Sequence, residues 1–120
     1  MTELERAGAL KVVTSVIARC ERAQPKFAQG TSQHTLLKNR IQALKIAQAL
    51  LVESGAELYS SQDLSAALEP LASIIRKCEK AQSKYEPESG QYGRFNGTIR
   101  AVELSRTLIE NELHRIYRNP

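Results

Sequence analysis

The sequence predicts an all-α protein, a four-helix antiparallel bundle built from two tandem helical hairpins. Three observations support this fold class: an internal repeat of 58 residues, apolar residues at helical spacing, and turn signals between the helical segments. Apolar and polar residues nowhere alternate as they do in a β-strand. We expect a single domain over residues 1–120, because a chain of this length can bury enough surface to fold without disulfides or metals.

The repeat emerges when the sequence is shifted by 58 residues, which places residues 10–51 over residues 68–109 without a gap. Twelve of the 42 aligned residues are identical. The most similar part aligns residues 15–27 with residues 73–85, and it places Cys20 over Cys78. This similarity indicates a tandem duplication, with one unit at about 3–55 and a second at about 61–118.

The first unit is predicted to form two helices joined by a short turn. Thr2 and Glu5 match the capping-box pattern that starts a helix. Residues 28–32 contain a glycine that can end this helix and two hydroxyl residues that can cap the next, although Pro25 can end the first helix earlier. The second helix is expected to close near Gly55. The expected apolar faces are Leu10, Val13, Val16, Ile17, Cys20, Ala23 and Phe27 in the first helix, and Leu37, Ile41, Leu44, Ala47 and Leu51 in the second.

The second unit repeats this plan. Ser60 and Asp63 supply another helix start, and residues 86–90 form the turn. One hairpin has too little apolar surface to be stable alone, so the two hairpins are expected to pack together, with exchange of hairpins in a homodimer as the alternative. The expected apolar faces are Leu64, Leu68, Leu71, Ile75, Cys78 and Tyr85, followed by Phe95, Ile99, Val102, Leu108, Ile109, Leu113 and Ile116.

The chain is mildly basic, with 17 Lys and Arg residues against 13 Asp and Glu residues and a net charge of +4. All of this net charge lies in residues 1–55, which contain eight basic and four acidic residues. The first six residues include three charged ones, and no apolar run approaches the length of a membrane span. We therefore expect a cytoplasmic protein without a transmembrane segment.

Two interpretations of the equivalent residues Cys20 and Cys78 remain open. As free thiols they can fill the core, which the reducing cytoplasm favours, or they can approach each other near a pseudo-twofold axis and form a disulfide. His34 and His114 lack the spacing of metal ligands, and neither cysteine has a histidine neighbour that could activate it. We therefore expect no catalytic residue, no metal, no cofactor and no enzymatic activity.

Polar residues at apolar positions suggest a candidate cluster formed by Arg40, Glu21, Glu79, Gln24 and Gln82. Arg40 falls within the expected apolar face of its helix, and a buried guanidinium needs a partner. We predict that Arg40 pairs with Glu21 or, across the pseudo-twofold axis, with Glu79. The cluster either fixes the register of the helices or forms a small pocket for an anionic or amide-bearing ligand.

Two basic stripes form the second candidate surface. Their residues are spaced by three or four positions, so each stripe follows one helix face that points away from the apolar side. Such a face is most often simply solvated, but it can also contact an acidic protein, anionic lipid headgroups or nucleic-acid phosphates. The stripes consist of Arg19, Arg22 and Lys26 in the first unit and Lys77, Lys80 and Lys84 in the second.

Together these features predict a non-enzymatic protein of the bacterial cytoplasm that acts by binding another protein, with a homodimer as one arrangement. The alternative is a nucleic-acid-binding or other anion-binding protein that uses the duplicated basic stripes. Nucleic acid is less favoured because tryptophan is absent and most of the six aromatic residues are expected in the core, which limits base stacking. A helix-turn-helix signature is also missing from the sequence.

Overall fold

The computed structural model describes residues 1–52 and 58–118, and every regular element in these ranges is helical. The predicted all-α fold class is therefore confirmed. The second helix ends before the position expected from the sequence, and Gly55 lies outside the described residues. The elements are α1 (Glu3–Ala23), the short 3-10 helix η1 (Gln24–Lys26), α2 (Ser32–Leu51), α3 (Ser61–Gln82) and α4 (Gly90–Arg118).

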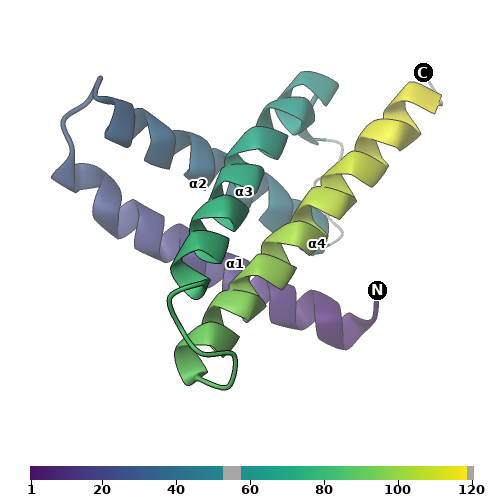
Figure 1. Cartoon of the computed structure of the whole chain (residues 1–120). Helices are drawn as coiled ribbons and strands as arrows, with labels where there is room; N and C mark the ends of the chain where they lie inside the picture. The colour runs from purple at the N-terminus through teal and green to yellow at the C-terminus, as the bar shows by residue number, and fades with distance from the viewer. Residues whose placement is uncertain (53–57, 119–120) are drawn as a thin grey trace.

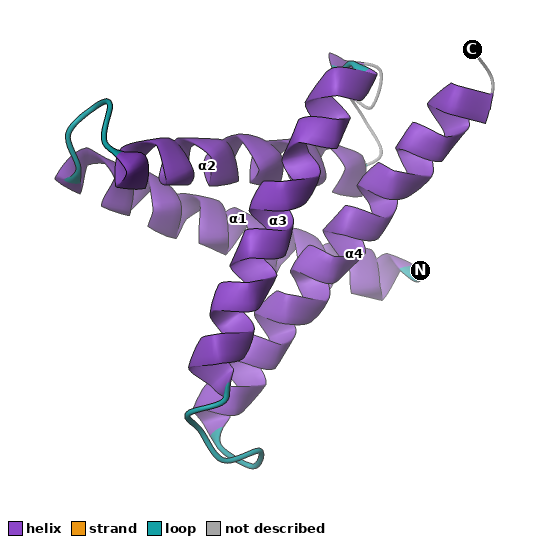
Figure 2. Cartoon of the chain, turned by 45° about the horizontal axis from the view of Figure 1, so that its top comes forward, coloured by secondary structure: helices purple, strands orange, loops and turns teal. Residues whose placement is uncertain are grey.

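The helices form two antiparallel hairpins, α1 with α2 and α3 with α4, which lie in two layers and cross each other (Figures 1 and 2). Helix α2 packs against α3, and α1 packs against α4. The molecule is flattened, with dimensions of 46 × 39 × 19 Å. The predicted helical bundle is thus confirmed, and its two hairpins cross so that the turn of each projects away from the other.

Both predicted capping boxes form. At the start of α1, Glu5 N–H donates to Thr2 Oγ1 and Thr2 N–H donates to Glu5 Oε1, both at 3.0 Å. At the start of α3, Asp63 N–H donates to Ser60 Oγ at 3.1 Å and Ser60 N–H donates to Asp63 Oδ2 at 3.2 Å. Each pair satisfies backbone donors that the first turn of a helix leaves without partners.

The turn of the first hairpin also follows the sequence signals. Helix α1 ends at Ala23, and Pro25 occupies the beginning of η1, so the proline does shorten the helix. Gly30 has a φ of +89°, a left-handed conformation that favours glycine. Thr31 then caps α2 by accepting a hydrogen bond of 3.3 Å from His34 N–H.

The core lies where the two hairpins cross, and its most deeply buried side chains come from all four helices. The predicted apolar faces were wrong at the hairpin tips, where Phe27 and Tyr85 are 39% and 42% exposed because they lie beyond the ends of α1 and α3. The buried face of α2 is also wider than predicted, since α2 contacts α1, α3 and α4. The most buried large side chains are Val13, Leu44, Ile46, Leu51, Leu64, Leu71, Val102 and Ile109.

Across the described residues, no helix combines the length and the apolar character needed to cross a bilayer.

Candidate functional site

A cleft of about 680 Å³ lies between the two hairpins, and its lining includes Ala23 and Tyr85, which are close to the two turns. Each of the four α-helices contributes side chains to it, and most of its surface is apolar. The apolar lining consists of Val16, Cys20, Ala23, Leu37, Ile74, Cys78, Ala81, Tyr85 and Phe95, and the polar lining consists of Arg19, Arg40, Lys77, Gln91, Arg94 and Thr98.

Most residues that line this cleft come in pairs with the 58-residue spacing seen in the sequence. Twelve of the lining residues form pairs separated by 58 positions. This is the arrangement that a pseudo-twofold axis passing through the cleft would produce. The pairs are Val16 with Ile74, Arg19 with Lys77, Cys20 with Cys78, Ala23 with Ala81, Leu37 with Phe95, and Arg40 with Thr98.

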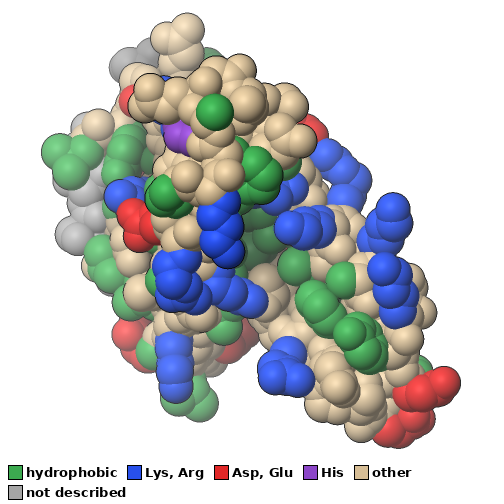
Figure 3. Space-filling model, turned by 90° about the vertical axis from the view of Figure 1, so that its left-hand side faces the viewer, with side chains coloured by type: hydrophobic (Ala, Val, Ile, Leu, Met, Phe, Trp, Pro, Cys, Tyr) green, Lys and Arg blue, Asp and Glu red, His purple; other side chains and the backbone are tan. Residues whose placement is uncertain are grey.

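The charges in the cleft are all positive. Arg19, Lys77 and Arg94 are exposed at its border, Arg40 is almost buried, and none of the lining residues is Asp or Glu. Figure 3 shows Lys and Arg side chains on both sides of the hollow, with hydrophobic side chains between them. A concave apolar surface with several cations and no carboxylate concentrates positive potential.

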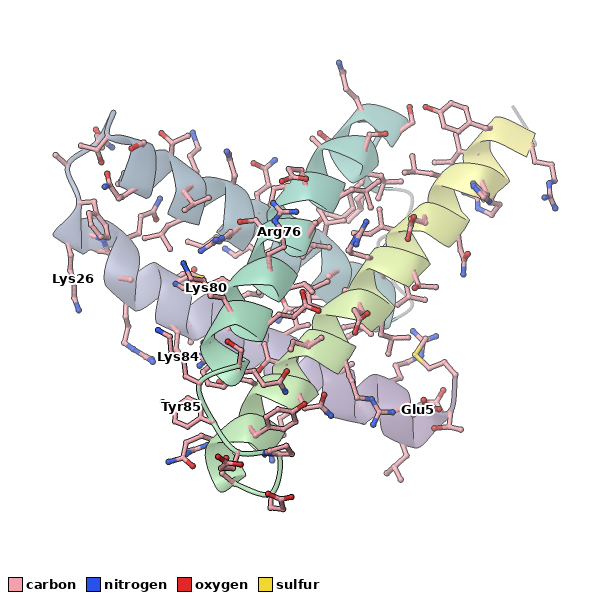
Figure 4. All side chains as sticks on the ribbon, viewed as in Figure 1. Glu5, Lys26, Arg76, Lys80, Lys84 and Tyr85 are labelled. Atoms are coloured by element: carbon pink, nitrogen blue, oxygen red, sulfur yellow. The ribbon has the colours of Figure 1, made fainter. Side chains whose placement is uncertain are left out.

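Each of the two predicted basic stripes contributes one residue to the lining of this cleft. All six of their residues are exposed, and Arg19 and Lys77 belong to the cleft lining itself. In Figure 4, Lys80 of α3 and Lys84, just beyond the end of α3, extend toward the angle between the hairpins, and Lys26 lies at the tip of the first hairpin. The crossing of the hairpins therefore brings together two surfaces that are far apart in the sequence.

The predicted ion pair of Arg40 was wrong. Arg40 Nη2 instead donates a hydrogen bond of 2.8 Å to Ser73 Oγ of α3. Glu21 is exposed, and its Oε2 lies 3.5 Å from Lys45 Nζ on α2. The reason is geometric: Glu21 is one helical step of about 100° away from the α1 face that borders the cleft. Glu79 is exposed as well and does not line the cleft.

Gln24 and Gln82 stabilise the hairpins rather than the cleft. Gln24 Nε2 donates to the carbonyl oxygen of His34 at 3.5 Å, and Gln82 Nε2 donates to that of Tyr92 at 3.1 Å. Each bond ties the end of one helix to the start of the next, and the two bonds are 58 residues apart in the sequence. The five residues predicted as one polar cluster are therefore separate, and Arg40 is the member that lines the cleft.

Cys20 and Cys78 are free, partly buried thiols in the cleft lining. Burial raises the pKa of both thiols, and the positive charges of Arg40, Lys77 and Arg19 offset this effect in part. A raised pKa keeps both thiols protonated at neutral pH, whereas a catalytic cysteine needs a lowered pKa. These two cysteines therefore contribute apolar surface to the cleft.

Sequence reasoning missed Ser73, Arg94 and the aromatic pair of Tyr85 and Phe95. The rings of Tyr85 and Phe95 stack, with centroids 6.0 Å apart, beside the cleft. The alignment did contain a signal for the aromatic residue. Tyr85 aligns with Phe27 at the 58-residue offset, so an aromatic residue occurs at the end of both aligned segments. Nothing in the sequence marked Ser73 as the partner of Arg40.

Within the described part of the chain, no three His, Cys, Asp or Glu side chains are placed to hold a metal ion. No protein-family model matches the sequence, and no curated protein or solved structure shows significant similarity to it. The chemistry of the cleft is therefore the basis for a functional hypothesis.

Proposed function

We propose that the protein is a non-enzymatic binding protein whose cleft receives an acidic, amphipathic helical segment of a partner protein. One observation supports this most strongly. The apolar lining residues of the cleft, which we call its apolar floor, lie beside Arg40 and the exposed cations Arg19, Lys77 and Arg94, and none of the lining residues is a carboxylate. An acidic amphipathic helix complements both properties, because its apolar face can pack on the floor while its carboxylates meet the cations.

The size of the cleft supports a segment of polypeptide. A volume of about 680 Å³ lies within the usual range of concave binding sites, roughly 300–1,000 Å³, and it can hold several side chains. Binding to a nucleic-acid duplex would rely on contacts between exposed cations and phosphates and would leave the apolar floor without a role. A protein segment uses the floor and the cations together.

The proposal includes a cytoplasmic location. Support comes from Cys20 and Cys78, which are free thiols in the lining of one cleft. A reducing compartment keeps such thiols from oxidation, and their apolar surface then stays available to the partner.

Direct binding of a synthetic peptide tests this function. The probe is a fluorescein-labelled helical peptide of about 18 residues, or five turns, with leucines on one face and glutamates on the other. We call it the acidic peptide and expect fluorescence anisotropy to give a Kd of about 1–100 μM. A basic peptide with lysine at every glutamate position should bind at least about tenfold more weakly. Binding of a mixed-sequence DNA duplex without binding of the acidic peptide would contradict the proposal.

A matched pair of variants locates the binding surface. The variant Arg19→Glu/Lys77→Glu reverses two cations of the cleft, whereas Lys11→Glu/Lys38→Glu makes the same change in net charge at exposed positions outside the lining. The first variant should weaken binding of the acidic peptide at least about tenfold, and the second less than about threefold. Equal losses in both variants would show that net charge, and not the cleft, governs binding.

A further inference from the structure

Arg40 is a charged side chain for which the described residues supply too few hydrogen-bond acceptors. The residue is only 7% exposed, and it is one of the residues that line the cleft. A guanidinium carries five N–H donors. Nη2 donates to the uncharged Ser73 Oγ, while Nε is buried without an acceptor. Among residues 1–52 and 58–118, no carboxylate forms an ion pair with Arg40.

A buried charge of this kind calls for a negative partner. Removing a charged group from water is costly unless hydrogen bonds and an opposite charge compensate for the lost hydration. The other charged residues of the cleft lining, Arg19, Lys77 and Arg94, are also cations, and the carboxylates of Glu21 and Glu79 lie outside the lining. No carboxylate of residues 1–52 and 58–118 supplies a countercharge, so the proposed partner segment is its source in this account.

We propose that Arg40 is the anchor for a carboxylate, an Asp or Glu side chain of the partner segment that enters the cleft. This inference rests on the proposed function and names the chemistry of its central contact. A single carboxylate matches the single charge of the guanidinium and accepts hydrogen bonds from it. Ser73 holds the guanidinium from α3, so the carboxylate binds where the two hairpins meet. Apolar side chains beside it pack on Cys20, Cys78 and Phe95.

A double-mutant cycle tests this contact. Affinities are measured for the wild type and Arg40→Met, each with the acidic peptide and with a neutral peptide that has glutamine at every glutamate position. The cycle is run at low salt and at about 1 M salt, where screening acts over about 3 Å. At high salt, Arg40→Met should weaken binding of the acidic peptide by about tenfold or more. It should weaken binding of the neutral peptide by less than about twofold.

The salt dependence separates the anchor from the border cations. Because Arg19 and Lys77 are exposed, the effect of Arg19→Glu/Lys77→Glu should largely disappear at high salt, whereas that of Arg40→Met should persist. Equal losses for the acidic and neutral peptides in Arg40→Met would overturn the anchor. If the acidic peptide fails to bind the wild type, the proposed function fails; if it binds wild type and Arg40→Met equally, only this inference fails.

Thermal unfolding of the free protein distinguishes the anchor from a structural role. Arg40→Met removes a buried charge that has no carboxylate partner among the described residues, so its Tm should equal or exceed that of the wild type. A large fall in Tm with unchanged peptide affinity would assign Arg40 to hairpin packing and overturn the inference. Arg40→Lys supplies a second variant that keeps the charge without the planar fork, and it should bind the acidic peptide with an affinity between those of the wild type and Arg40→Met.

Discussion

Arg40 and Ser73 join the two hairpins by a hydrogen bond of 2.8 Å from Nη2 to Oγ, between α2 and α3. Around this bond the hairpins meet largely through apolar side chains such as Leu44, Leu71 and Val102. The bond places a positive charge at the boundary between the core and the cleft. Its contribution to stability and its contribution to binding can be measured separately.

Replacing Ser73 by alanine should lower the free energy of unfolding by about 1–3 kcal/mol, because the guanidinium of Arg40 would lose its acceptor in a buried position. Urea denaturation measures this change. Ser65→Ala is the control, since Ser65 is exposed on the same helix and its replacement should change stability by no more than about 0.5 kcal/mol. Equal stabilities of the two variants would show that the hydrogen bond adds nothing.

Gln82→Ala should destabilise the protein more than Gln24→Ala. Gln82 Nε2 lies 3.1 Å from its acceptor, the carbonyl oxygen of Tyr92, whereas Gln24 Nε2 lies 3.5 Å from that of His34. We expect a loss of about 1 kcal/mol for Gln82→Ala and less for Gln24→Ala, because hydrogen bonds weaken as they lengthen. Chemical denaturation of both variants checks the order, and the reverse order would contradict the role given to these bonds.

Arg6 caps the end of α2. Its Nη1 donates to the carbonyl oxygens of Leu50 at 3.1 Å and Leu51 at 2.9 Å, both in the last turn of the helix, where carbonyl groups lack the i+4 N–H donor of the helix interior. Arg6→Ala should lower the free energy of unfolding by about 1–2 kcal/mol. Lys11→Ala, at an exposed position of α1, is the control. Equal free energies of unfolding for Arg6→Ala and Lys11→Ala would show that the cap does not contribute to stability.

The cleft thiols should react slowly and should make the folded state sensitive to alkali. Burial raises the pKa of Cys20 and Cys78, so the folded state holds their protons at a pH where the unfolded thiols ionise. Stability from these groups is complete below the unfolded pKa of about 8.5 and is lost as the pH rises through the folded value. As the pH rises above about 8.5, the free energy of unfolding should fall less for Cys20→Ala/Cys78→Ala than for the wild type.

Thiol labelling at pH 8 checks the same shift directly. Both cysteines should react more slowly with an aromatic disulfide reagent than free glutathione does, because less thiolate is present. The acidic peptide should slow the reaction further by covering the cleft. Faster reaction than glutathione would mean that the cations outweigh burial, and it would contradict the assignment of these thiols to apolar surface.

Local signals in the sequence predicted much of the fold. The capping pairs at Thr2 and Ser60, the break at Pro25 and the turn at Gly30 each depend on neighbouring residues, so they could be found without knowledge of tertiary structure. The 58-residue offset also anticipated that Cys20 and Cys78 occupy corresponding places, and both line the cleft. Each of these features follows from short-range geometry or from the repeat.

The partner of Arg40 could not be predicted in the same way. A helical wheel gives the direction of a side chain about its own helix axis, but it does not give the angle at which a neighbouring helix crosses. The crossing of the hairpins brings α3 over α2, so Ser73 and not Glu21 meets the guanidinium. The exposure of Phe27 and Tyr85 was missed because the wheel was continued past the ends of α1 and α3, where helical spacing no longer holds.

The most direct test of the central claim is a titration of ¹⁵N-labelled protein with the acidic peptide, followed by NMR. If the cleft binds an acidic segment, the largest chemical-shift changes should cluster at Cys20, Arg40, Lys77 and Phe95, which lie on four different helices and share one cleft. The corresponding titration of Arg19→Glu/Lys77→Glu should show much smaller changes. Saturable changes confined to the carboxyl-terminal half of α4, or no changes at all, would contradict the account.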